Sequence, residues 1–283
     1  MKLLTLNTHS LEEPGYAEKT EKFIEMLVKE QPDIIALQEV NQSLAEKELP
    51  DIMLDGFTRC NGFNVPVRLD NHARKVVEEL RKRGVYYYWT WISAKIGYGK
   101  YDEGMALLSR KPVRRVQEFL ISRSDDYENW KTRKTLGIQV EGTDDWFFTV
   151  HMGWWNDTEE PFARQWECLQ EFLSQPEYTE GFIWLMGDFN SLDNVEEEGY
   201  ELILESGWSD TYLSAMEKDN GITVAEEIDG WRSEDGIENP ERKEKRLDYI
   251  FCNRSEDIKS SKVVCNGTNY PIVSDHYGVM IEL

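Results

Sequence analysis

The sequence contains few cysteines and no long apolar run. Its four cysteines, at positions 60, 168, 252 and 265 of 283 residues, form no CxxC pair, which argues against a zinc knuckle or a disulfide framework. No stretch approaches the roughly 18 to 20 apolar residues of a membrane span, and the first residues, MKLLTLNTHS, lack the features of a signal peptide. We therefore expect a soluble, cytoplasmic protein without a membrane partner.

Positive charge is also scarce. The chain has 32 Lys and Arg residues against 54 Asp and Glu residues, which gives a net charge of −22. Non-specific nucleic-acid binding depends on cationic side chains that neutralise phosphates, so this balance argues against a nucleic-acid partner. Bound divalent metals can offset carboxylates locally, so a nuclease with one favourable face stays an alternative.

The chain shows neither a Pro/Gly/Ser-rich linker nor a repeat, and we expect one domain over residues 1–283. Short apolar runs alternate with amphipathic stretches, which is typical of a layered α/β protein. The predicted strands are 2–7, 33–38, 85–92, 104–109, 134–140, 146–151, 182–187, 246–252 and 277–282, and the predicted helices lie around 23–28, 73–80, 162–173 and 196–206. The long acidic stretch at about 214–245 is predicted to be a loop near the substrate.

Polar residues that can bind a cation or move a proton recur at the ends of the predicted strands. A scaffold presents such residues together at one edge, which points to a common site. They are Asn7, Glu39, His151, Asp188, Asn190, Asp248, Ser274, Asp275 and His276.

The motifs around these residues, in the order TLNTH, LQEV, VHMGWW, GDFNS, RLDYIF and SDHYGV, resemble those of the endonuclease/exonuclease/phosphatase superfamily of metal-dependent phosphoesterases. The resemblance covers nearly the whole chain. It implies a DNase I-like fold, a four-layer α/β/β/α sandwich in which two mixed β-sheets lie face to face with helices outside.

The resemblance also implies a metal site. It gives Glu39 as the main magnesium ligand, with Asn7 beside it and Asp248 completing the metal region directly or through water. Carboxylate and amide oxygens suit Mg²⁺, with Mn²⁺ as a substitute. The number of metal ions is left open.

Catalytic roles follow from the same resemblance. His276 resembles the general base, with Asp275 fixing its tautomer, and Asp188 resembles the group that positions the attacking water or handles its proton. Asn190 and His151 would bind phosphoryl oxygens. The family pattern leaves open which group is the base.

Two further histidines are less defined. His9 follows the Asn7 motif and either lines the site or has a structural role, and His72 is expected on the surface of its helix.

The superfamily hydrolyses DNA, phosphoinositides, sphingomyelin, RNA tails and small phosphate monoesters, so other residues must indicate the substrate. The stretches LDNHA, YYYWTW, GYGKYDEGMALLSR, HMGWW and IDGWR resemble bacterial phosphatases that act on maltose 6'-phosphate. This resemblance predicts a magnesium-dependent phosphoric monoester hydrolase for an intracellular sugar phosphate, with no protein partner. Its candidate sugar contacts are Asp70, Asn71, Trp155 and Trp231.

Three alternatives remain. A DNA endonuclease or exonuclease of the exonuclease III type should have a basic groove, and apart from Arg81–Arg83 and Arg114–Arg115 the sequence has no such cluster. A sphingomyelinase or phosphoinositide phosphatase should have a membrane-binding hairpin or a basic face. An inactive binding module is disfavoured because every expected catalytic position is occupied.

Overall fold

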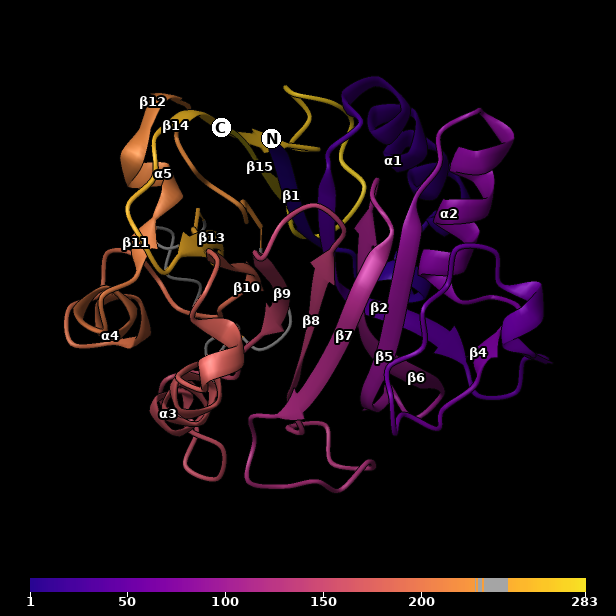
Figure 1. Cartoon of the computed structure of the whole chain (residues 1–283), viewed down its shortest axis with the longest axis horizontal. Coiled ribbons are helices and arrows are strands. Elements are labelled where there is room, and N and C mark those ends of the chain that lie inside the picture. The colour runs from indigo at the N-terminus through magenta and orange to yellow at the C-terminus, as the bar shows by residue number, and fades with distance from the viewer. Residues whose placement is uncertain (227, 229–230, 232–243) are drawn as a thin grey trace.

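Two mixed β-sheets form the centre of the structure, a computed structural model that describes residues 1–226, 228, 231 and 244–283 (Figure 1). The seven-stranded sheet has the order β12 (Ala215–Lys218), β14 (Ile258–Val264), β15 (Gly278–Glu282), β1 (Lys2–Asn7), β2 (Ile34–Ser43), β6 (Tyr101–Ser109) and β5 (Tyr88–Gly97). The six-stranded sheet has the order β11 (Ser209–Asp210), β13 (Asp248–Cys252), β10 (Ile183–Asp188), β9 (Trp146–His151), β8 (Lys134–Val140) and β7 (Val113–Leu120). The pairs β1–β2, β12–β14 and β9–β10 are parallel, and the other neighbours in these two sheets are antiparallel.

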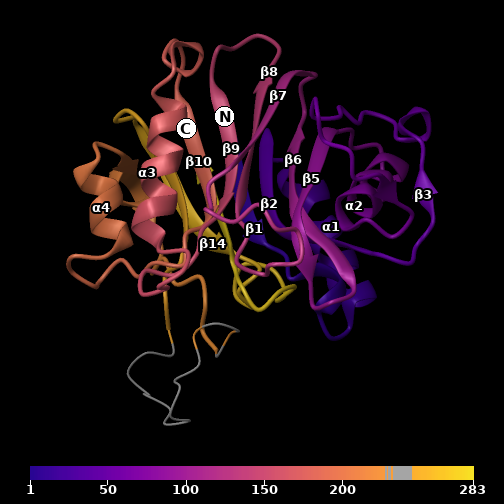
Figure 2. The same ribbon diagram turned by 90° about the horizontal axis from the view of Figure 1, so that it is seen from below.

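Helices cover the outer faces of both sheets. Figure 2 shows α1 (Tyr16–Glu30) and α2 (His72–Lys82) beyond the seven-stranded sheet, and α3 (Phe162–Leu173) and α4 (Gly199–Glu205) beyond the six-stranded sheet. The remaining elements are short: α5 (Thr211–Ser214), the 3-10 turns Ser10–Glu12, Asp51–Met53 and Pro176–Tyr178, and the small sheet of β3 (Glu48–Leu49) and β4 (Val67–Arg68). The layers confirm the predicted four-layer α/β/β/α sandwich. No helix in the described part of the chain has the length and apolar character that a bilayer crossing requires.

The apolar patterns explain why these elements pack as layers. In β1, Leu3, Leu4 and Leu6 are all buried, which is expected of a strand covered on both faces. In α3, Trp166 and Leu169 face the six-stranded sheet, within a stripe of buried residues spaced three and four apart. Burial of these faces supplies most of the stability of such helices.

Each predicted strand corresponds to a strand of the structure, and β1, β8, β9 and α3 have the predicted bounds. The sequence analysis missed two long strands, β7 and β14, and the short strands β3, β4, β11 and β12, of which β12 lies in the predicted loop. In β7, Arg114 and Arg115 interrupt the apolar alternation, and in β14 the run of Lys259 to Lys262 hides it. Strands with an exposed face tolerate such charges, so their apolar signal is weak.

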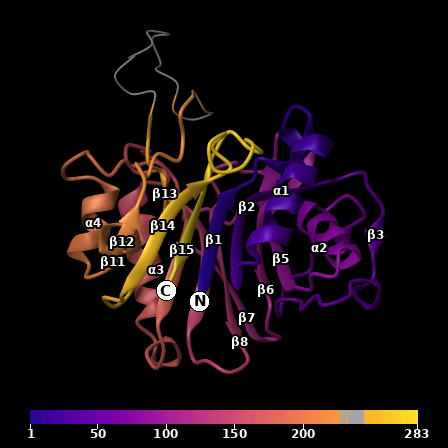
Figure 3. The ribbon, with the colours of Figure 1, turned by 90° about the horizontal axis from the view of Figure 1, so that it is seen from above.

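The two ends of the chain lie side by side, as Figure 3 shows. β1 pairs with β15, and the Leu283 N–H donates to the Met1 carbonyl at 2.9 Å. This pairing brings the segment before β15 to the end of β1, where the Ser274 hydroxyl donates to the Asn7 carbonyl at 2.8 Å. The first and last motifs of the sequence therefore meet.

The first turn of α2 contains a buried histidine, so the prediction that His72 lies on the surface is wrong. Only 4% of His72 is exposed, and its Nδ1 lies 3.0 Å from the Tyr16 hydroxyl of α1. Burial, with a smaller contribution from the charge of Lys75, lowers the pKa of His72 to about 3. The neutral ring is thus part of the contact between α1 and α2.

Candidate active site

The ends of strands from both sheets bring the predicted polar residues together. Asp188 at the end of β10 is in register with His151 of β9 and with Asp248 of β13. Asn7 ends β1, and Glu39 lies in the neighbouring β2. The Asn7 amide reaches Asp188 across the two sheets, so both sheets contribute to one site.

Asp188 is at the centre of this cluster. Its Oδ2 accepts a hydrogen bond from Asn7 Nδ2 at 3.1 Å, and its Oδ1 accepts one from the Asn190 backbone N–H at 2.8 Å. The same Oδ2 lies 3.7 Å from His151 Nε2 and 3.8 Å from His276 Nε2. These two distances exceed a direct hydrogen bond, so two imidazole rings face one carboxylate without being bonded to it.

Asp248, and not Asp275 as the sequence analysis predicted, orients His276. His276 Nδ1 lies 2.9 Å from Asp248 Oδ2, and both residues are buried. Burial opposes the charge of the ring, but the carboxylates of Asp248 and Asp188 outweigh it and raise the pKa of His276 well above its ordinary value. The two carboxylates therefore favour the protonated form of the His276 ring.

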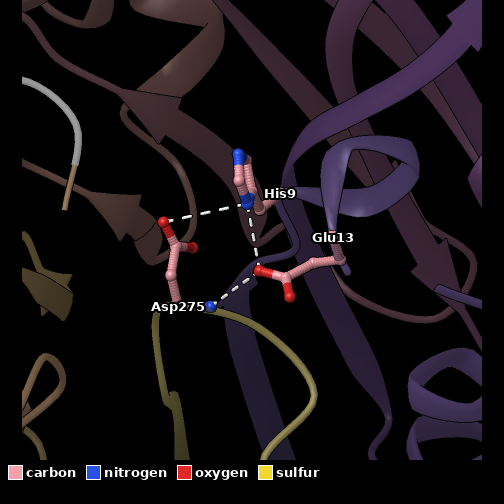
Figure 4. Close-up of side chains that lie close together, drawn as sticks. All are labelled: His9, Glu13 and Asp275. Carbon is pink, nitrogen blue, oxygen red and sulfur yellow. Dashed lines mark hydrogen bonds and ion pairs between the residues drawn. The ribbon is translucent and has the colours of Figure 1, made fainter. Parts of the chain in front are cut away.

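Asp275 belongs to a neighbouring cluster with His9 and Glu13, shown in Figure 4. His9 Nδ1 lies 3.0 Å from Glu13 Oε1 and 3.8 Å from Asp275 Oδ2. Glu13 Oε1 also accepts the Asp275 backbone N–H at 3.0 Å, which turns the Asp275 side chain toward His9. Burial lowers the pKa of His9, but its bond to Glu13 and the charges of Glu39 and Asp275 raise it to about 9. His9 therefore carries a charge at the edge of the site.

Glu39 enters the site from an irregular point in β2. The register between β2 and β6 shifts between Leu37 and Val40, and Glu39 has a φ of 50°. A bulge re-aims a side chain, and a positive φ is strained for a residue other than glycine. Glu39 Oε1 accepts from Asn7 Nδ2 at 2.9 Å, while Asn7 Oδ1 accepts the His9 N–H at 3.2 Å. Asn7 thus presents its amide hydrogens to the carboxylates, in place of the predicted oxygen ligand.

The carboxylates fit a divalent cation. Burial, followed by the charges of Glu103 and Asp275, raises the pKa of Glu39 to about 7. Burial also raises the pKa of Asp188 to about 6. The buried Asp248 Oδ1 has no hydrogen-bond partner among the described residues. Buried carboxylates are costly without a partner, and hard cations bind such oxygens. Glu39, Asp275 and the free oxygen of Asp248 are the groups that would hold Mg²⁺ or Mn²⁺.

Glu39, Asp188 and Asp275 line a cleft of about 330 Å³, which contains residues that the sequence analysis did not assign to the site. A larger groove of about 430 Å³ is lined by other residues, among them Lys29 and Tyr270, and contains none of the catalytic candidates. The unassigned residues of the cleft are Lys95, Gly97, Tyr98, Glu103, Trp130, Arg133, Trp154 and Ile228.

Two of these residues are buried cations. Lys95 of β5 is 7% exposed, and Arg133, just before β8, is 3% exposed. Lys95 Nζ lies 3.0 Å from Glu103 Oε1. Burial, together with the charges of Arg133 and Lys95, lowers the pKa of His151 well below its ordinary value, so His151 is neutral. Lys and Arg are rarely buried, and nothing in their sequence neighbourhood marks these two as interior.

Asp70 and Asn71, predicted to contact sugar, do not line the cleft. Both carboxylate oxygens of Asp70 accept the Ser43 backbone N–H, at 3.1 and 3.2 Å. Asn71 is buried and caps α2, where its Oδ1 accepts the Arg74 N–H at 3.1 Å. Asp and Asn commonly satisfy backbone donors at turns and helix starts. The structure therefore gives both residues a structural role in place of the predicted sugar contact.

The two predicted tryptophan contacts differ in outcome. Trp155 packs against Phe162 of α3, with ring centroids 6.2 Å apart, and its neighbour Trp154 lines the cleft instead. Trp231 adjoins the site, because its Nε1 donates to Asn190 Oδ1 at 2.9 Å. Residues 227, 229, 230 and 232–243 of the predicted loop lie outside the described residues.

Comparison with known proteins shows the family of this chain. Residues 4–276 match the model of the Endonuclease/Exonuclease/phosphatase family. The chain belongs to this family. Members of the Endonuclease/Exonuclease/phosphatase family are phosphoester hydrolases that generally use divalent metals, and the buried acidic and histidine cluster is compatible with that chemistry. Among curated protein sequences, none matches the chain.

Solved structures of the family share the fold. A family protein from Leptotrichia buccalis C-1013-b is 34% identical, with a TM-score of 0.83 over 100% of this chain and 98% of that one. The mannosyl-6-phosphatase Bt3783 of Bacteroides thetaiotaomicron is 14% identical, with a TM-score of 0.65 over 100% and 98%. The Neisseria 3' phosphatase NExo, bound to a product DNA hairpin, is 18% identical, with a TM-score of 0.61 over 100% and 99%. The fold is DNase I-like, as predicted.

Proposed function

We propose that this protein is a divalent-metal-dependent phosphatase that hydrolyses the phosphate monoester of an intracellular sugar, maltose 6'-phosphate or a similar disaccharide phosphate. The main support is the placement of one carboxylate, Asp188, between a neutral and a charged histidine inside a small cleft. Sugar phosphates are charged and do not cross a bilayer unaided, so we also propose a cytoplasmic location.

In this proposal Asp188 accepts the proton of the attacking water. Its raised pKa of about 6 makes it a stronger base than an ordinary aspartate, while most of it is ionised near neutral pH. The charged His276 neutralises a phosphoryl oxygen, and Asp248 holds that ring in place. The neutral His151, which lies 3.7 Å from Asp188 on its other side, donates a hydrogen bond to a phosphoryl oxygen.

Asn190 adds a further donor to the phosphate. Its Nδ2 donates to the Met152 carbonyl at 3.0 Å, and an amide nitrogen carries a second hydrogen. Its Oδ1 is fixed by Trp231, so the direction of the amide is set. A bound Mg²⁺ would polarise the phosphoryl oxygens and offset the charge that develops during hydrolysis.

Size and charge support a small substrate. The cleft of about 330 Å³ is at the lower end of the range for small-molecule sites. With a net charge of −22, the protein repels a polyanion more than a substrate with one phosphate, and in the cleft Lys95, Arg133 and His276 offset part of the negative charge of the four lining carboxylates, Glu39, Glu103, Asp188 and Asp275.

The test is phosphate release in the presence of Mg²⁺ over maltose 6'-phosphate, trehalose 6-phosphate, glucose 6-phosphate, mannose 6-phosphate and nucleotides, with plasmid nicking measured in parallel. We expect release from disaccharide phosphates to exceed release from nucleotides at least tenfold. EDTA and the Asp188→Asn variant are the controls, and both should abolish release.

Other results would contradict the proposal. Plasmid nicking without monoester hydrolysis would make the protein a nuclease. Hydrolysis of sphingomyelin or phosphoinositides in place of sugar phosphates would make it a lipid phosphoesterase.

A further inference from the structure

We propose that Trp130 and Trp154 form an aromatic platform that stacks the sugar rings of a disaccharide phosphate, and thereby determine specificity; this inference rests on the proposed function. Trp130 lies in the connection between β7 and β8, and Trp154 follows β9. Both line the cleft that contains Asp188 and His276.

The exposure of Trp130 is the first observation. In the described part of the chain, 54% of the Trp130 surface is exposed to solvent, although burying a tryptophan side chain stabilises a protein more than burying most others. Trp130 and Trp154 have ring centroids 5.7 Å apart and planes inclined by 56°. A large apolar surface held at the wall of a polar cleft is typical of a ligand contact.

Buried cations fix the position of the platform. Lys95 Nζ donates to the Trp130 carbonyl at 2.7 Å, and Arg133 Nη1 donates to the same carbonyl at 2.9 Å. The Arg133 guanidinium also lies 5.7 Å from the centre of the Trp154 ring. Burying two cations is costly, and here both hold one main-chain oxygen beside the cleft. The arrangement fixes the backbone that carries Trp130.

The two connections that carry the tryptophans are also tied to each other. Lys131 Nζ lies 2.7 Å from Asp157 Oδ2. The Glu160 carboxylate accepts the backbone N–H groups of Arg123 and Ser124 at 2.7 and 2.8 Å. The platform is therefore held in position before a ligand binds, which reduces the entropy lost on binding.

The geometry favours linked sugar rings over a nucleobase. A pyranose presents an apolar C–H face that packs on an aromatic ring and hydroxyl edges that need polar partners. Two aromatic planes inclined by 56° do not form a slot for one flat base, but each can cover one ring of a bent disaccharide. Lys95, Arg133 and His151 line the same cleft as the two tryptophans, so the platform adjoins the phosphate end of the cleft.

The test compares Trp130→Ala with Trp155→Leu, which removes a partly buried tryptophan that packs on α3 instead of lining the cleft. For each protein the ratio of kcat/KM on maltose 6'-phosphate to kcat/KM on glycerol 3-phosphate is measured with Mg²⁺, because glycerol phosphate has no ring to stack. We expect Trp130→Ala to lower this ratio at least tenfold, mainly through KM, and Trp155→Leu to change it less than twofold. Trp130→Tyr should restore most of the ratio.

A binding measurement separates this inference from the proposed function. The indole N–H signal of Trp130, assigned by its loss in Trp130→Ala, is followed by NMR during titration with unphosphorylated maltose and with adenosine. A shift with maltose that exceeds the shift with adenosine supports the platform even if no sugar phosphate is hydrolysed, which would overturn only the proposed function. An unchanged kcat/KM ratio in Trp130→Ala, or a larger shift with adenosine, would overturn the platform.

Discussion

Two carboxylates neighbour His276, one in the sequence and the other in the structure, and they have different roles. Asp275 precedes His276 in the chain, but its side chain faces His9, while Asp248 comes from another strand and bonds to the ring. Asp248 positions His276 through its Oδ2. The charge of Asp275 acts instead on Glu39, whose pKa it helps to raise. Substitution at these two positions should therefore affect different steps.

We predict that Asp248→Asn lowers kcat at saturating Mg²⁺ at least tenfold, because His276 loses the charge that keeps it protonated and oriented. Asp275→Asn should leave kcat at saturating Mg²⁺ largely unchanged and only raise the Mg²⁺ concentration that gives half-maximal activity, because Asp275 is one of the groups that would hold the ion but does not hold the His276 ring. Activity measured across a Mg²⁺ titration distinguishes the two effects.

The nitrogen-15 NMR shifts of the His276 ring provide an independent check of its protonation. The apparent pKa of His276 should fall in Asp248→Asn and change less in Asp275→Asn. The assignment would be wrong if Asp248→Asn kept its kcat at saturating Mg²⁺ and left the His276 pKa in place.

At the scale of elements, the contact between α1 and α2 contains a titratable group that folding forces to be neutral. His72 is buried against Tyr16, and its pKa falls from 6.5 to about 3. The unfolded chain therefore binds a proton at mildly acidic pH that the folded chain does not. The stability associated with this residue is present above pH 6.5 and is lost as the pH falls from there toward 3.

We predict that wild-type protein loses about 2 kcal/mol more unfolding free energy than His72→Gln when the pH falls from about 7.5 to about 5. Urea unfolding of both proteins at the two pH values measures this difference, and other groups cancel because both proteins share them. Equal pH dependence in the two proteins would mean that His72 is accessible to protons in the native state.

At the scale of the whole molecule, the charge of −22 opposes compaction. Local pairs such as Lys2–Glu30 and Arg246–Asp210 offset part of it, but the excess of carboxylates remains. Salt screens repulsion between exposed charges over about 8 to 10 Å at moderate ionic strength. Added salt should therefore stabilise this protein, in contrast to one held together by surface ion pairs.

We predict that raising NaCl from about 20 to about 300 mM raises the Tm by roughly 2 to 5 °C. The measurement is made in EDTA, so that bound Mg²⁺ does not contribute, and KCl at equal ionic strength is the control. A fall in Tm would show that favourable ion pairs outweigh the repulsion.

The sequence by itself determined the layered class, most strand and helix positions, and the set of polar residues at strand ends. These features depend on local patterns: apolar runs bounded by turn residues, helical spacing, and motifs in a fixed order. Asn7, Glu39, His151 and Asp188 follow such runs directly and His276 precedes the last of them, so their meeting at one edge was predictable.

Only the tertiary structure decided which neighbour each side chain faces. Adjacent residues such as Trp154 and Trp155 point to different surroundings, and sequence composition does not distinguish them. Lys95 comes from β5 and Arg133 from the connection before β8, and both became site residues through contacts across the fold. Partners of this kind depend on side-chain direction and long-range packing, which no local pattern encodes.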